Sequence, residues 1–227
     1  MPKSIHRVTT VIKSISDEFG VRRIKLGDVD DWPLPPFTAG AHIDVYLPSG
    51  KVRHYSLCGD PADNSRYHIA VKRDANSRGG SIEVHETLKV GQELLISLPR
   101  NFLPLTYTEG CVIMVAGGIG ITPFLSMLPE LERRDAKYLL HYCTRSPAAT
   151  PLKDMLHPYD KKVNFYHSET RTRMDIKALI DNIGDKDHLY ICGPTAMLHA
   201  AEELGAHLGN RLHIEYFGVG ETSSDPA

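Results

Sequence analysis

The segment Cys111–Met127, with the sequence CVIMVAGGIGITPFLSM, constrains the fold more than any other part of the chain. Its first half is an unbroken apolar run, which is typical of a strand buried on both faces of a parallel sheet. Glycines follow at 117, 118 and 120, and Thr122-Pro123 then opens an apolar-periodic segment. Threonine is a good N-cap and proline suits the first helical turn, so a helix should begin near Pro123. A strand, a glycine turn and a helix N-terminus form a layout that binds pyrophosphate through backbone N–H groups.

The glycine turn alone is weak evidence for a nucleotide site. A tight turn in any α/β domain would explain it equally simply. The pattern also departs from G-x-G-x-x-G, because Pro123 stands three positions after Gly120. A standard dinucleotide-binding dehydrogenase is therefore not the first interpretation. Motifs elsewhere in the chain are needed to tell which ligand, if any, the turn binds.

Length, charge and cysteine spacing exclude several classes of protein. The 227 residues suffice for one large domain or two of about 110 residues each. A net charge of −2 gives no basic field for nucleic acid, and no apolar run reaches the ~18 residues of a membrane span. Met1–Thr10 lacks the apolar core of a signal peptide. The four cysteines are far apart and contain no C-x-x-C pair, so their spacing supports neither a zinc site nor an iron–sulfur cluster, and it favours reduced thiols in a cytoplasmic protein.

The spacing of elements changes near residues 104–110. Before this point, short predicted strands alternate with Pro/Gly turns at intervals of about ten residues, which favours an antiparallel barrel or sandwich. After it, strands alternate with helices, which predicts a parallel sheet with helices on both faces. We therefore expect an all-β antiparallel domain over residues 1–106, an α/β domain over residues 107–217 and a polar linker or tail over residues 218–227.

The expected elements can be given by their residues. The first domain should contain a turn at Ser14–Gly20, a helix at Ile82–Leu88 and strands at His6–Ile12, Val21–Leu26, His42–Leu47, Lys51–Leu57, Arg66–Val71 and Glu93–Leu98. The second domain should contain strands at Val112–Ala116, Tyr138–Cys143, Val163–Tyr166, His188–Cys192 and Leu212–Glu215. Its helices should lie at Pro123–Arg133, near Asp175–Asn182 and at Pro194–Leu208.

Three further segments carry residues suited to an anionic, aromatic ligand. On the strand Arg53–Ser56, the arginine could bind a phosphate, the tyrosine could pack against an aromatic ring, and the serine hydroxyl could hydrogen-bond a ring nitrogen. An ordinary strand without a ligand is the simpler interpretation of these four residues. Arg78–Ser81 opens a helix, where exposed N–H groups beside a cation suit a phosphate as well as they suit a plain loop. Cys192–Pro194 follows a strand of the parallel sheet, and ligands bind at the carboxyl ends of such strands. Two phosphate-capable turns in two domains suggest two nucleotides, or a flavin and a nucleotide.

In this order the motifs resemble the ferredoxin–NADP⁺ reductase superfamily. They are R-x-Y-S ending at Ser56, G-G-S ending at Ser81, GGIGITP ending at Pro123, C-G-P ending at Pro194 and E-Y-F ending at Phe217. Within the superfamily, AVKRD at Ala70–Asp74 with the following RGGS is similar to phthalate dioxygenase reductase and vanillate demethylase reductase. The resemblance covers nearly the whole chain, and five ordered motifs are far more specific than any one of them.

The resemblance implies a flavoprotein that takes hydride from NADH, or NADPH, onto FMN, or FAD, and passes single electrons to an iron–sulfur domain or ferredoxin that feeds a Rieske-type terminal oxygenase. It implies that the flavin is bound by Arg53, His54, Tyr55, Ser56, Ala70, Val71, Lys72, Arg78, Gly79, Gly80 and Ser81. The nicotinamide dinucleotide would be bound by Gly117, Gly118, Gly120, Ile121, Thr122, Pro123, Thr144, Arg145, Ser146, Cys192, Gly193 and Pro194. Ser56, Cys192 and Glu215 would align the reacting rings, and Phe217 would lie near the flavin.

Two features depart from the phthalate type. Those reductases carry a plant-type [2Fe–2S] domain with C-x4-C-x2-C spacing, which this chain cannot supply. We therefore expect either a longer protein or a separate electron carrier. Ser146 stands where the phthalate type has an acid, and a carboxylate there would repel a 2′-phosphate, so NADPH stays open beside NADH.

Two other functions stay open. One is a non-catalytic flavin-binding regulatory or electron-transfer subunit on the same scaffold, although such subunits usually carry a cysteine-rich metal site that this sequence lacks. The other is a flavohaemoglobin-type fragment, which would require a globin domain upstream of the first strand.

Overall fold

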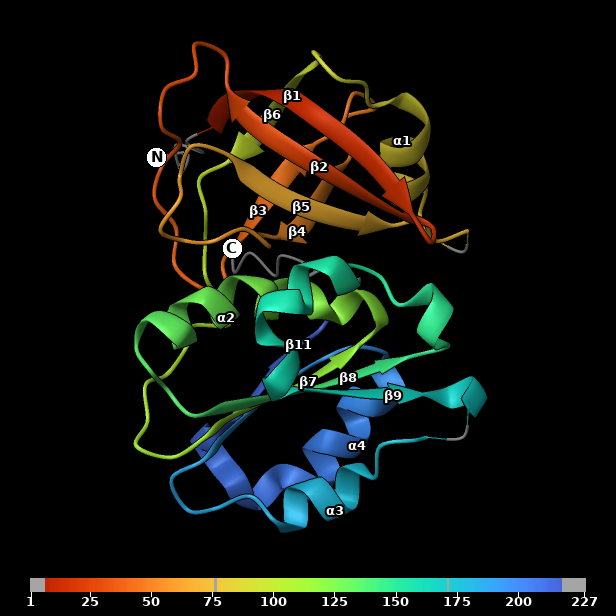
Figure 1. The fold of residues 1–227 in the computed structure, drawn as a ribbon. Coiled ribbons are helices and arrows are strands. Elements are labelled where there is room, and N and C mark those ends of the chain that lie inside the picture. Colours follow the sequence, from red (N-terminus) through yellow and green to blue (C-terminus); the bar gives the residue numbers. More distant parts are fainter. Residues whose placement is uncertain (1–6, 76, 171, 218–227) are drawn as a thin grey trace, which may run out of the picture.

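The computed structural model describes residues 7–75, 77–170 and 172–217, which form an antiparallel sheet followed by a parallel sheet (Figure 1). The predicted tail at 218–227 lies outside the described residues. The change from antiparallel to parallel pairing falls between residues 97 and 112, as the element spacing predicts. The domain limits themselves stay a prediction, because one apolar cluster joins both sheets.

The first sheet has six antiparallel strands in the order β4-β3-β6-β1-β2-β5. They are β1 (Arg7–Glu18), β2 (Val21–Asp28), β3 (His42–Tyr46), β4 (Val52–Ser56), β5 (Tyr67–Lys72) and β6 (Glu93–Ser97), with α1 (Gly80–Thr87) between β5 and β6. The two edges approach each other just beyond β4, where the Cys58 N–H donates to the His68 carbonyl at 2.9 Å. The sheet therefore curls toward a barrel, and Val84 of α1 is buried in the same core cluster as Ile43 and Leu94.

The predicted turn at Ser14–Gly20 is wrong over most of its length. β1 continues to Glu18 with a register shift between Ile12 and Ser14, and only Phe19 and Gly20, both at positive φ, make the reversal. The polar sequence looks like a loop because these residues leave the core. Ion pairs from Arg22 to Asp17 at 2.7 Å and from Arg23 to Glu18 at 2.9 Å link the two strands there.

The second sheet has five parallel strands in the order β11-β10-β7-β8-β9. They are β7 (Val112–Gly117), β8 (Tyr138–Thr144), β9 (Val163–His167), β10 (His188–Cys192) and β11 (Leu212–Glu215). The α-helices are α2 (Thr122–Arg133) on the face toward the first sheet, and α3 (Ile176–Asp181) and α4 (Thr195–Gly205) on the other (Figure 1). The 3₁₀ segments are Gly118–Ile121, Pro147–Ala149, Lys153–Lys162, Ser168–Thr170 and Ala206–Arg211. Strand order reverses at β7, so its carboxyl end is a topological switch point, where such sheets bind ligands.

Two helix predictions need correction, and one helical segment was missed. Thr122 is not an N-cap: the helical path already starts with the 3₁₀ turn at Gly118–Ile121, and the Thr122 hydroxyl donates to the Ile119 carbonyl at 3.1 Å. α4 ends at Gly205 and continues only as a 3₁₀ segment. The ten-residue segment Lys153–Lys162 was not predicted, because it is a 3₁₀ segment with an internal proline rather than a 3.6-periodic helix.

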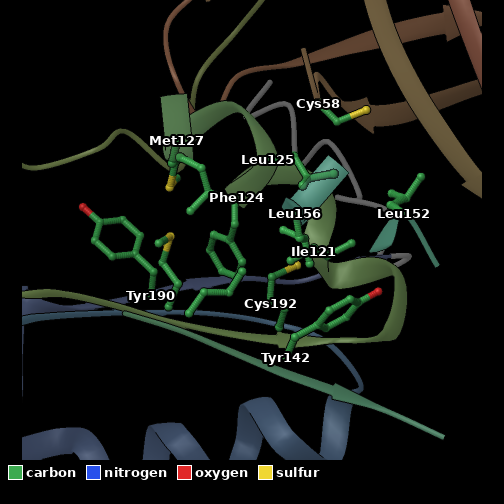
Figure 2. Packing of buried hydrophobic residues seen from close by; sticks show 14 of the residues in the cluster. Cys58, Ile121, Phe124, Leu125, Met127, Tyr142, Leu152, Leu156, Tyr190 and Cys192 are labelled. Atoms are coloured by element: carbon green, nitrogen blue, oxygen red, sulfur yellow. The ribbon is translucent and has the colours of Figure 1, made fainter. Parts of the chain in front are cut away.

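Helix α2 joins the two sheets through a common apolar core (Figure 2). Its Phe124 and Leu128 are fully buried and cluster with Ala39 and Leu103 from the first sheet region. Burial of each such large side chain contributes about 1.5–3 kcal/mol. The Gly40 N–H also donates to the buried Ser126 hydroxyl at 2.9 Å. The two halves are therefore packed as one body, and segments at their junction have fixed relative positions.

Candidate functional site

The loop before α1 forms a cradle for an anion against β4. A Cβ at Gly80 would lie 2.3 Å from the Arg53 Nε, so a larger residue there would force the arginine side chain away from the helix start. Gly79 has φ 83° in the left-handed region, and no side chain caps the helix. The free N–H groups of α1 and the Arg53 guanidinium therefore converge on one place, which suits a phosphate.

The other residues predicted around this loop have mixed placements. Ser81 holds the loop together, since its Oγ accepts from the Asp74 N–H at 3.1 Å and lies 3.0 Å from the Ser77 Oγ. The Val71 side chain lies in the core of the first sheet, and its carbonyl bonds His85 at 2.8 Å. Only the backbone of Val71, and not its side chain, could therefore contact a ligand. Ala70 lies instead in the cluster that joins the sheets, and Lys72 is exposed.

Strand β4 presents its residues alternately to two faces, as a period of two requires. Tyr55 packs against the core of the first sheet, and burial raises the pKa of its phenol to about 12. Ser56 is buried, and its Oγ has no hydrogen-bond partner within the described part of the chain. His54 points to the other side from Arg53 and Tyr55 and bonds Asp44 through its Nδ1. An orphaned buried hydroxyl at this point fits a ligand that would accept or donate there.

The glycine turn touches the Cys192–Pro194 segment backbone to backbone. A Cβ at Gly117 would lie 2.4 Å from the Pro194 Cδ, and one at Gly120 would lie 2.2 Å from the Cys192 carbonyl oxygen. Gly118 has φ +55°, in the region that favours glycine. The structure therefore brings together two motifs that lie about 75 residues apart in the sequence, at the carboxyl ends of β7 and β10.

Cys192 and Glu215 are register partners on β10 and β11 at the same end of the sheet. Cys192 is fully buried, and desolvation, with the nearby Glu215 carboxylate, raises the pKa of its thiol well above the ordinary value. Glu215 Oε2 is buried with no partner among the described residues, and burial raises the pKa of this carboxyl to about 7. A neutral thiol and a carboxyl that changes charge near neutrality therefore lie side by side.

Replacing Glu215 with glutamine should stabilise the protein above pH 7. The native pKa of about 7 exceeds the ordinary 4.5, so the folded state binds more protons between these values and the free energy of unfolding falls as pH rises through that window. The variant should lose this decline and gain at most about 3 kcal/mol above pH 7. Denaturant titrations of both proteins at about pH 5 and about pH 8 measure the free energy of unfolding and its change with pH. Equal pH dependence in both proteins would assign the titration to another group.

A pocket of about 250 Å³ opens at the carboxyl ends of β8 and β9. It is lined by Cys143, Thr144, Tyr166, Ser168, Thr172, Arg173, Met174, Ile176 and Met197. The pocket continues the glycine turn, because the Met197 Sδ lies 3.4 Å from the place of a Gly117 Cβ. Of the residues predicted here, Thr144 lines the pocket. Arg145 and Ser146 lie outside its lining, and the exposed Arg145 pairs with Glu169 at 2.7 Å.

The sequence reasoning missed most of this pocket. Tyr166, Ser168 and Arg173 come from β9 and the segment after it, and Met197 from α4. The carboxyl-end rule applied to β9 as well as to β7 and β10 would have found the first two. Phe217, the last described residue, is partly exposed at 38%. None of the described helices is long and apolar enough to cross a membrane.

The fold defines a class of protein: a six-stranded antiparallel sheet packed on a five-stranded parallel sheet is the architecture of the ferredoxin–NADP⁺ reductase type. Residues 114–203 match the family described as "Oxidoreductase NAD-binding domain". A solved structure of phthalate dioxygenase reductase superposes with a TM-score of 0.89 and 35% identity, covering 99% of this chain and 72% of that one. Its title describes electron transfer from pyridine nucleotides to [2Fe–2S].

Curated relatives agree with this assignment. The carnitine monooxygenase reductase subunit of Escherichia coli (strain K12) is 40% identical over 213 residues, covering 90% of this chain and 66% of its own length. Phthalate dioxygenase reductase of Burkholderia cepacia is 38% identical over 206 residues, covering 88% of this chain and 64% of its own. The chain belongs to the family of oxygenase reductase components that includes phthalate dioxygenase reductase and vanillate demethylase reductase. It spans slightly less than two thirds of the length of these two curated relatives.

Proposed function

We propose that this chain is the flavin- and nucleotide-binding part of an NADH-dependent oxygenase reductase. One observation carries the proposal: Cys58, beside the flavin motifs, packs in the same apolar cluster as Ile121 and Cys192, beside the nucleotide motifs (Figure 2). Ala70, also beside the flavin motifs, belongs to the same cluster. The two half-sites therefore meet across an apolar junction. A reductase needs this arrangement, because the two reacting rings must lie in contact while water is excluded.

We propose FMN as the flavin. Arg53 and the N–H groups at the start of α1 form a cradle suited to a single terminal phosphate. Tyr55 would wall the ring, and the orphaned Ser56 hydroxyl would hydrogen-bond a ring nitrogen. When bound, the flavin supplies the redox chemistry, accepting a hydride and releasing electrons singly.

The parallel sheet would hold the dinucleotide. Backbone N–H groups of the Gly117–Pro123 turn would bind the pyrophosphate, and the 250 Å³ pocket would take the adenosine half. The buried neutral Cys192 would press the nicotinamide toward the flavin and keep water out. Glu215 would hold or release a proton beside it near neutral pH.

We propose NADH as the preferred donor. Arg145, on the loop after β8, is bound to Glu169 at 2.7 Å, so its charge is compensated and a carboxylate lies on the same loop cluster; Arg173 is the arginine that lines the pocket itself. Electrons would leave to an iron–sulfur domain or ferredoxin and then to a Rieske-type oxygenase or demethylase. This route agrees with relatives that are a phthalate dioxygenase reductase and a vanillate O-demethylase oxidoreductase, and with the [2Fe–2S] acceptor of the solved phthalate dioxygenase reductase.

The purified protein should be yellow and should be bleached by NADH under anaerobic conditions. Released flavin identifies FMN or FAD by chromatography, and steady-state reduction of a dye acceptor gives kcat/KM for NADH and NADPH. We expect FMN and at least about a tenfold preference for NADH, from roughly 1.4 kcal/mol of charge repulsion. Protein that binds no flavin would overturn the proposal. Bound flavin that NADH does not reduce would instead indicate a non-catalytic electron-transfer subunit.

A further inference from the structure

Strands β3 and β4 place two imidazoles and a carboxylate on one face of the first sheet. His42 and Asp44 lie two residues apart on β3, so both point the same way. His54 on β4 is the register partner of Asp44 and therefore shares that face. This face is opposite to the one that carries Arg53 and Tyr55, and it also carries Ser56, the register partner of His42. The flavin and nucleotide assignments give these three side chains no joint role.

The three side chains have the spacing of metal ligands. One ligand atom from each lies within 4.8 Å of the other two, and no other group of three His, Cys, Asp or Glu residues in the described ranges 7–75, 77–170 and 172–217 meets this condition. The two imidazole rings stand 6.0 Å apart at 89°, and the His54 Nδ1 already bonds Asp44 Oδ1. Tetrahedral zinc with bonds of about 2.0–2.1 Å holds its ligand atoms roughly 3.3 Å apart, so modest side-chain rotations would close the group around an ion.

We propose that His42, Asp44 and His54 form a binding site for a divalent transition metal of the zinc type. Two imidazoles with one carboxylate suit such ions, whereas magnesium and calcium prefer oxygen ligands. Three protein ligands leave a fourth position for water, as in exchangeable zinc sites rather than closed structural ones. The proposal does not depend on the flavin or the nucleotide.

Neighbouring residues hold the Asp44 and His42 side chains in place. Arg100 donates to the second carboxylate oxygen of Asp44, and the Asp44 N–H donates to Ser97 Oγ at 2.9 Å. Such outer partners fix the direction of a ligand side chain. The ring of Phe102 lies 5.1 Å from that of His42 and covers it. Because Arg100 offsets the carboxylate charge, the imidazoles should supply most of the affinity.

Two of the three proposed ligands are buried and the third is exposed, so an ion could reach the site from solvent. His42 is 7% exposed and Asp44 8%, so both are held by the sheet. The His54 side chain is 60% exposed, which leaves a route for an ion from solvent. Removing the His54 imidazole should therefore disturb binding without disturbing the fold.

Calorimetric titration of the purified, metal-stripped protein with Zn²⁺ tests the proposal. The wild type should bind one Zn²⁺ at this site with a dissociation constant of about micromolar or tighter, and Mg²⁺ should give no comparable binding. His54→Gln should weaken this binding at least about tenfold. The matched control His157→Gln removes an exposed histidine of the 3₁₀ segment Lys153–Lys162 and should leave the affinity unchanged.

A second measurement needs no variant. Cu²⁺ bound to the wild type should show electron paramagnetic resonance couplings to two imidazole nitrogens. Zn²⁺ affinity that is the same in His54→Gln as in the wild type, no saturable Zn²⁺ binding, equal binding of Mg²⁺, or Cu²⁺ without imidazole coupling would each overturn the proposal.

Discussion

Replacing Gly120 with alanine should lower NADH-dependent turnover by at least about a hundredfold while the flavin stays bound. The added Cβ would lie 2.2 Å from the Cys192 carbonyl oxygen and 2.8 Å from the Gly193 nitrogen. These are backbone atoms, so they cannot rotate away as a flexible side chain could. The turn, which would hold the pyrophosphate, and the Cys192–Pro194 segment, which would hold the nicotinamide, must then separate. The proposed flavin residues lie on the other sheet and are not displaced.

The alanine variant of Gly59 is the matched control. A Cβ at Gly59 would meet only the His68 side chain, at 3.5 Å or more, which is ordinary contact. Its turnover should stay close to that of the wild type. Stopped-flow reduction by NADH, with flavin absorbance and circular dichroism to verify cofactor and fold, measures the effect. Normal reduction by Gly120→Ala would contradict the close approach and the role assigned to the turn.

Replacing Ser56 with alanine should slow reduction of the bound flavin by about a hundredfold, the effect expected when one preorganised hydrogen-bond donor is removed. Flavin should still bind, because the phosphate cradle at Arg53 and Gly80 is untouched. Without flavin, the same change should leave the stability unchanged or raise it. The Ser56 hydroxyl is buried without a partner in the described structure, and such a group costs about 1–3 kcal/mol.

Ser97→Ala is the comparison variant, because it should lower the stability of the flavin-free protein, whereas Ser56→Ala should not. Its buried hydroxyl accepts from the Asp44 N–H at 2.9 Å and donates to the Leu98 carbonyl at 2.8 Å. Alanine there breaks two bonds and should destabilise the flavin-free protein by about 1–3 kcal/mol. Thermal unfolding of both variants shows whether each change raises or lowers stability, and stopped-flow kinetics gives the rate at which NADH reduces the bound flavin. If Ser56→Ala were destabilised like Ser97→Ala, the serine would have a structural partner; an unchanged rate would remove it from the mechanism.

The effects of both variants depend on contacts that sequence patterns do not contain. The G-G-I-G-I-T-P pattern predicted a close turn, but the atoms it approaches belong to Cys192 and Gly193, far along the chain. Likewise, R-x-Y-S marked Ser56 as a residue of interest, yet the absence of a protein partner for its hydroxyl is a property of the packed site. Hydrogen bonding and van der Waals exclusion act between atoms in space, and only the fold sets those distances.

Local errors in the sequence reasoning have the same origin. Ser14–Glu18 looks like a turn because it is polar, but pairing with β2 and ion pairs across the strands make it part of β1. Thr122 looks like an N-cap, but a preceding 3₁₀ turn carries the helical path past it. The period of two already placed His54 on the face opposite to Arg53 and Tyr55, but only the structure shows that its partner there is Asp44. At Ser14–Glu18, pairing with a neighbouring strand overrides the local preference of polar residues for a turn.

By itself, the sequence determined the two classes of sheet, the position of the change between them and the glycine turn after β7. Periodicity, chain reversals and backbone freedom are local properties, so they can be read along the chain. Only the tertiary structure decided that α2 joins the sheets, that a pocket opens beyond β8 and β9, and that Glu215 is shielded enough for its pKa to reach about 7. Burial and desolvation depend on every element packed around a group, and no single stretch of sequence contains that information.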